Sequence, residues 1–226
     1  MEKTAVKAIV FDAYGTLFNI NSLDHVLNQY FGDKASELSS LWRKKQLEYT
    51  WLRTLMGRYK RFSEVTMDAL VHSCNSLGLT VTDEIRNHLH KKYLELEAYP
   101  EVPLVLKSLS EKVALGVLSN ANQTMLQGAI NRNNLGTFLT QVLSVEEISL
   151  FKPRKEVYQL ACDGFQVLPK EILFVSANTW DVVGAKSFGL RVAWLNRFQT
   201  VKEELGLEPD YILNEMQELM LVMGYK

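Results

Sequence analysis

The chain has 226 residues, 47% of them hydrophobic, and a formal net charge of −1 at pH 7. This length and composition support one large domain, or a core with a smaller insertion, around a well-filled apolar interior. Because the charge is close to zero, we expect no general attraction to nucleic acid or to an anionic membrane.

The N-terminal residues do not have the pattern of a secretory signal. Glu2 and Lys3 precede an apolar stretch of only a few residues, and no apolar run approaches the length of a membrane span. The sequence therefore predicts a cytoplasmic location.

The first expected element is a strand over residues 5–11, which ends directly before Asp12. Its nearly continuous apolar and β-branched residues are typical of a strand buried on both faces of a parallel sheet. A carboxylate at the end of such a strand costs free energy unless pairing or function requires it. Ligands of open α/β sheets bind at the carboxyl ends of strands, so we expect Asp12 to point into a site, with Gly15 turning the chain away. The alternative is an aspartate that only caps a turn.

Residues 18–97 are expected to form an inserted helical domain. They contain no convincing strand, and their pattern predicts helices at 23–31, 34–57, 63–77 and 82–95. Ser63 and Thr82 stand where N-caps belong, and Gly57 and Gly78 stand where helices end.

From about residue 99, strands alternate with helices, which is typical of a parallel sheet with crossover helices. The expected strands are 113–118, 141–144, 172–175, 191–195 and 211–213. The expected helices are 101–111, 123–133, 154–165, 181–188 and 214–223. The sequence thus predicts an α/β core domain of residues 1–17 and 98–226, interrupted by the helical domain.

Polar residues gather where these strands end. Ser119 and Asn120 precede a helix, where they and nearby backbone N–H groups can hold an anion, although such a pair also makes ordinary turns. Lys152 precedes a proline that is expected to start a helix and to fix the lysine at its mouth. The run 176–181 carries more polar and aromatic groups than a turn needs.

The cysteines and histidines do not have the spacing of metal ligands. Cys74 and Cys162 are isolated and are expected to be buried structural cysteines. His88 and His90 are two residues apart, which points them in different directions on a helix. We expect neither a metal nor a cofactor.

Taken together, Asp12, Ser119, Lys152 and Asp181 match the motifs of the haloacid dehalogenase superfamily, which the whole chain resembles. The resemblance implies a doubly wound, Rossmann-like parallel-sheet core with a cap domain inserted after the first strand. It also implies that Asp12 is a nucleophile.

Two departures from the phosphatases of that superfamily narrow the expected activity. Phosphatases carry a second acid two residues after the nucleophile, where this chain has Tyr14, and a Gly-Asp pair where it has Ser176-Ala177-Asn178. Asp12 and Asp181 alone would coordinate a hard cation poorly. These departures, with the runs 11–18, 41–53 and 176–181, resemble the L-2-haloacid dehalogenase branch. Ala13 is a small deviation, because this position is often larger in the branch.

The resemblance implies a hydrolytic dehalogenase of (S)-2-haloacids that forms an ester on Asp12. Lys152 and Thr16 would hold this nucleophile. Tyr158 would contact these residues without touching the substrate. Arg43 would face the departing halide, since a weakly hydrated guanidinium suits a soft anion. Asp181, with Ser176 and Asn178, would activate water for ester hydrolysis.

The remaining implied contacts concern substrate binding. Ser119 and Asn120 would hold the substrate carboxylate beside Asp12 and Ala13. An apolar wall would surround the alkyl group and the halogen, formed by Tyr14, Leu47, Phe62 and Trp180. For these four residues, ordinary core packing is the competing interpretation.

The expected partner is a small-molecule 2-haloacid, and the apolar positions of helix 34–57 together with the resemblance predict a homodimer. The alternatives are that the chain is a phosphatase of the same superfamily, or a non-catalytic protein of the same fold.

Overall fold

The computed structural model describes residues 5–225, which contain a six-stranded sheet with the strand order β3-β2-β1-β4-β5-β6. All neighbouring strands are parallel. The strands are β1 (Ala8–Phe11), β2 (Ala114–Ser119), β3 (Gln141–Ser144), β4 (Ile172–Ser176), β5 (Arg191–Leu195) and β6 (Tyr211–Leu213). The predicted α/β parallel-sheet core is confirmed, although β1 begins at Ala8 rather than at residue 5.

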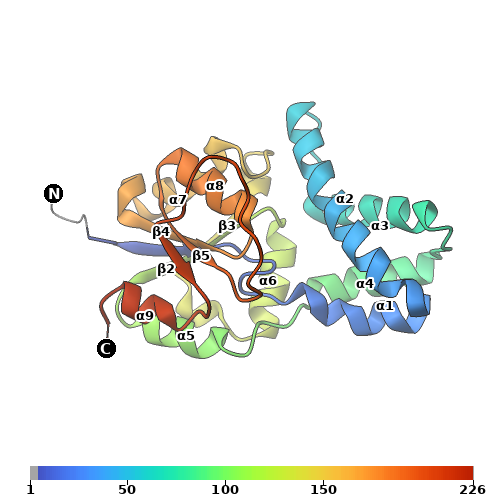
Figure 1. Ribbon diagram of the computed structural model, residues 1–226, viewed down its shortest axis with the longest axis horizontal. Helices are drawn as coiled ribbons and strands as arrows, with labels where there is room; N and C mark the ends of the chain where they lie inside the picture. Colours follow the sequence, from blue (N-terminus) through green and yellow to red (C-terminus); the bar gives the residue numbers. More distant parts are fainter. Residues whose placement is uncertain (1–4, 226) are drawn as a thin grey trace.

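Helices cover both faces of this sheet, as expected of a doubly wound fold. Figure 1 shows α7 and α8 on one side of it and α5 and α9 on the other. The helices of this part are α5 (Val102–Ser110), α6 (Gln123–Arg132), α7 (Lys155–Phe165), α8 (Thr179–Phe188) and α9 (Glu218–Val222). The α8 helix starts two residues earlier than predicted because the N–H groups of Asp181 and Val182 already donate to Asn178 O. The α9 helix is shorter than predicted.

The helical segment, residues 18–97, lies to one side of the sheet (Figure 1). It contains α1 (Asp24–Phe31), α2 (Ala35–Leu55), α3 (Phe62–Ser76) and α4 (Asp83–Leu94). Thr82 caps α4 by accepting from Ile85 N at 3.2 Å. The predicted cap at Ser63 is wrong, because α3 already begins at Phe62 and the backbone N–H of Arg61 donates to Glu64.

The two connections to this segment run side by side. Asn19 N donates to Glu97 O at 2.8 Å, and Tyr99 N donates to Leu17 O at 3.0 Å. The chain therefore leaves and re-enters the sheet part at one place, near the limits predicted for the domains, whose division stays a prediction. No helix among residues 5–225 is both long and apolar enough to cross a membrane.

The middle of β2 has no room for a side chain at Gly116. A Cβ atom there would lie 2.7 Å from the ring of Phe165 and 3.1 Å from Gln141 O. Gly116→Ala should therefore lower the free energy of unfolding by about 1–3 kcal/mol, as overpacking does. The control is Gly136→Ala, where the nearest atom is 3.7 Å away. Equal urea midpoints for the two variants would contradict the packing argument.

Candidate active site

Asp12 follows β1 and is almost buried, with 6% of its surface exposed. Its N–H donates to Val175 O, so the backbone of the sheet fixes its position. Its Oδ1 accepts from Lys152 Nζ at 3.0 Å. Its Oδ2 accepts from Thr16 Oγ1 at 3.0 Å and from Asn178 Nδ2 at 2.8 Å. These donors offset the desolvation of a buried charge.

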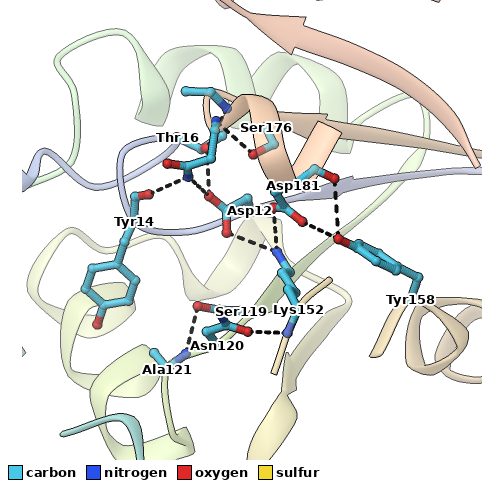
Figure 2. Close-up of polar contacts among 12 residues, drawn as sticks. Asp12, Tyr14, Thr16, Ser119, Asn120, Ala121, Lys152, Tyr158, Ser176 and Asp181 are labelled. Carbon is cyan, nitrogen blue, oxygen red and sulfur yellow. Dashed lines mark hydrogen bonds and ion pairs between the residues drawn. The ribbon is translucent and has the colours of Figure 1, made fainter. Parts of the chain in front are cut away.

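The Lys152 ammonium lies between two carboxylates (Figure 2). It is 3.0 Å from Asp12 Oδ1 and 2.9 Å from Asp181 Oδ2, and the other oxygen of Asp181 accepts from Tyr158 OH at 2.7 Å. Burial by itself would lower the pKa of Lys152, but the two carboxylates raise it above its ordinary value. The group is thus held as an ammonium ion.

The pKa of Asp181 moves in the unusual direction for a paired acid. Burial raises it to about 6, and the charge of Asp12 adds to this, against the opposing effect of Lys152. Asp181 is fully buried at the start of α8. It therefore changes its charge within the range in which enzymes work.

The helix after Lys152 does not start at Pro153, which is a correction to the prediction. The α7 helix begins at Lys155, so Pro153 precedes it and Tyr158 lies in its first turn. The loop is held instead by Asn120, whose Oδ1 accepts from Lys152 N at 2.9 Å. A side chain after β2 thus fixes the backbone that carries the ammonium ion.

The other polar residues predicted for the site tie the strand ends together. Ser119 Oγ accepts from Ala121 N at 3.1 Å, Ser176 Oγ accepts from Asn178 N at 3.1 Å, and Thr16 Oγ1 accepts from Ala177 N at 2.9 Å (Figure 2). Because Ser119 and Asn120 use their oxygens as acceptors, their hydroxyl and amide hydrogens can serve an anion.

Tyr14 brings the sheet and the helical segment into contact. Its ring stacks on Tyr93 of α4 with 5.5 Å between centroids and lies 6.2 Å from the ring of Phe62. Burial raises the pKa of the Tyr14 phenol well above its ordinary value, and its hydroxyl has no hydrogen-bond partner among residues 5–225. Ala13, fully buried, adds only a methyl group beside Asp12. An apolar wall therefore forms around Tyr14.

Trp180 and Leu47, which were also predicted for that wall, have other surroundings. The ring of Trp180 packs edge-on against Trp51 of α2, with 5.6 Å between centroids. Both line a largely apolar pocket of about 500 Å³, to which Lys152 and Gly184 also contribute. Leu47 is half-buried, one turn after Arg43 on α2. Their roles toward a substrate stay predictions.

Arg43 lies half-buried on α2. Its Nη1 donates to Gln46 Oε1 at 2.7 Å, and its charge acts on both Tyr14 and Tyr93. The sequence analysis missed Gln46 and Tyr93, which lie beside it, and Thr66, which contacts Gln46. One signal was available: Leu38, Trp42, Gln46 and Thr50 recur every four residues, which continues an apolar helical stripe with two polar residues.

A model of the haloacid dehalogenase-like hydrolase family matches residues 6–189. The chain is 42% identical to (S)-2-haloacid dehalogenase 1 of Pseudomonas sp. (strain CBS-3) over 95% of each chain. It is 39% identical to (S)-2-haloacid dehalogenase 2 of the same strain, over 97% of this chain and 96% of the relative. The chain therefore belongs to the haloacid dehalogenase-like hydrolase family.

The fold of the chain is also similar to that of a solved L-2-haloacid dehalogenase. The L-2-haloacid dehalogenase from Xanthobacter autotrophicus with chloropropionic acid covalently bound has a TM-score of 0.92 and 33% identity, covering 98% of this chain and 100% of that one. The resemblance to the L-2-haloacid dehalogenase branch that the sequence motifs predicted is confirmed.

The pKa of Asp181 gives a prediction for the pH dependence of activity. If the carboxylate must be ionised to activate water, kcat should fall as the pH decreases through about 6. Tyr158→Phe removes a donor that favours the ionised form, so the acid limb should move to higher pH. Tyr211→Phe, on the edge strand β6, is the control for kcat measured from pH 5 to 9. If the acid limb of the kcat profile does not move in Tyr158→Phe, the limb belongs to a group other than Asp181.

Proposed function

We propose that this protein hydrolyses short-chain (S)-2-haloalkanoic acids to (R)-2-hydroxyalkanoic acids, through an ester formed on Asp12. The observation that carries the proposal is the buried Asp12 carboxylate held by Lys152, Thr16 and Asn178. The comparisons also support the proposal, because relatives at 39% and 42% identity are (S)-2-haloacid dehalogenases.

The hydrogen bonds of Asp12 favour one oxygen as the nucleophile. A carboxylate oxygen can accept about two hydrogen bonds. Oδ2 has two donors, whereas Oδ1 has only the ammonium of Lys152 and keeps a lone pair. Oδ1 would attack C2 of the substrate from the side opposite the halogen, so that a C–O bond forms while the halide leaves with the bonding electrons.

Hydrolysis of the ester completes the cycle. Asp181 takes a proton from water, whose oxygen adds to the carboxyl carbon of Asp12. The bond from this carbon to the substrate oxygen then breaks, and the leaving alkoxide takes the proton back from Asp181, so the bond from C2 to oxygen stays intact. Ser176 and Asn178 position the loop that leads to Asp181. The covalently bound chloropropionic acid in the Xanthobacter autotrophicus relative supports a covalent step.

Substrate binding uses the remaining groups. Ser119 and Asn120, with backbone N–H groups, hold the substrate carboxylate, and Arg43 receives the halide. The rings of Tyr14 and Phe62, with Leu47 and Trp180 as further predicted members, exclude water from the displacement.

The reaction proposed here is independent of a metal ion. A cation between Asp12 and Asp181 is already supplied by Lys152, at 3.0 and 2.9 Å from them. A halide leaves as a stable anion without a proton, so the acid that phosphatases place two residues after the nucleophile is not needed. Tyr14 at that position disfavours the alternative function of a phosphatase.

L-2-chloropropionate should therefore be converted to D-lactate at an undiminished rate in excess EDTA, because one backside displacement inverts C2. In a single turnover in ¹⁸O-labelled water, mass spectrometry should find the label in Asp12 rather than in lactate. Asp12→Asn should fold normally and release no halide. Retained configuration, or an activity that EDTA abolishes and magnesium restores, would contradict the mechanism.

A homodimer and a cytoplasmic location complete the proposal. The end of α2 exposes 82% of Leu55 and 60% of Met56, an apolar surface that a second copy would cover. Light scattering at micromolar concentration should give about twice the chain mass of 25.9 kDa. Leu55→Asp should lower that mass, whereas Leu221→Asp, at an equally exposed leucine of α9, should not. A monomer mass for the wild type would refute the dimer.

A further inference from the structure

We propose that Gln46, Thr66 and Tyr93 are positioning residues that fix the guanidinium of Arg43 for the departing halide. They come from three different helices of the helical segment, α2, α3 and α4. The inference rests on the proposed function, since it takes Arg43 as the halide ligand.

The three side chains form one buried hydrogen-bond network. Gln46 and Thr66 are 1% and 0% exposed, and Tyr93 is 2% exposed. Gln46 Nε2 lies 2.7 Å from Thr66 Oγ1 and 3.0 Å from Tyr93 OH, and Gln46 Oε1 lies 2.7 Å from Arg43 Nη1. Buried polar groups of this kind are costly unless each is satisfied, so the network has little freedom to rearrange.

The direction of these hydrogen bonds determines which end of Gln46 faces Arg43. The hydroxyl of Thr66 donates to Phe62 O at 2.7 Å, so toward Gln46 it can only accept. The amide nitrogen of Gln46 must therefore point at Thr66, which turns its oxygen toward Arg43. A guanidinium only donates, so this is the one amide orientation that it can use.

Tyr93 restrains the same oxygen and the space beside it. Burial raises the pKa of Tyr93, against the influence of Arg43, so its phenol keeps a proton and donates to Gln46 Oε1 at 3.2 Å. The cavity that Arg43, Gln46 and Tyr93 share with Trp42 measures only about 10 Å³. This space is too small for the guanidinium to move into, so packing on this side agrees with the hydrogen bonds.

Thr66 supplies the most informative substitutions. Thr66→Val keeps the shape of the side chain but removes the acceptor that orients Gln46. It should lower kcat by between about ten- and a hundredfold, as small misplacements of catalytic groups do. It should also raise the inhibition constant of bromide, the product halide. Thr66→Ser, which keeps the hydroxyl, should recover most of both losses.

A buried threonine of the same helical segment provides the matched control. Thr50 on α2 is 0% exposed, and its hydroxyl donates only to Leu47 O of its own helix. Thr50→Val should leave the bromide inhibition constant unchanged. If Thr50→Val and Thr66→Val raise it equally, the effect is general loosening of the segment and the inference is wrong. If Thr66→Val does not fold, Gln46→Met and Tyr93→Phe are measured in its place with the same expectations.

A double-mutant cycle with Arg43→Lys tests whether the network acts through Arg43. In that background Thr66→Val should cause little further loss of kcat, because the guanidinium that it orients is gone. Full additivity of the two losses would overturn the inference. Failure of the proposed function would give another result, because the wild type itself would then release no halide from L-2-chloropropionate.

Discussion

The buried charges of Asp12, Lys152 and Asp181 are the constraint on which the rest of the structure depends. Three ions at 6%, 1% and 0% exposure are stable only if each has partners, and removing the one cation, Lys152, would leave both carboxylates unpaired and cost about 3–5 kcal/mol. One ammonium between two carboxylates leaves a negative charge, which hydroxyl and amide donors must balance. The ends of β1 and β4 and the loop before α7 lie together because the hydrogen bonds and ion pairs of these groups connect them.

The strand order satisfies this constraint with short connections. Because β1 lies between β2 and β4, the residues after all three strands meet at one edge of the sheet. Thr16 and Asn178 reach Asp12 from its own loop and from the β4 side. Asn120 reaches across from β2 to the backbone of Lys152. The sheet part thus places donors around the Asp12 carboxylate without the helical segment.

This division explains what could be predicted from the sequence. The apolar strand before Asp12 and the polar residues after later strands are local patterns, and they predicted which residues of the sheet part the structure brings together. Gln46 continues the apolar stripe of its helix, but a glutamine at such a position looks like a solvated one until its partners on other helices, Thr66 among them, are known. The predicted role of Pro153 was also wrong, because the helix that was expected to start at this proline begins two residues later, at Lys155. Tertiary contacts decide such cases.

The two cations of the site differ in what surrounds them, and this difference supports the tasks proposed for them. Lys152 contacts two carboxylates, so its charge is already compensated and exerts little attraction on a further anion. The recorded side-chain partner of Arg43 is the neutral amide of Gln46, beside the protonated phenol of Tyr93. Among residues 5–225 no carboxylate forms an ion pair with Arg43, so its charge is positioned without being neutralised, and a guanidinium in a region of aromatic rings attracts an anion strongly. A neutral network can hold a halide ligand in place, whereas an acidic one would occupy it.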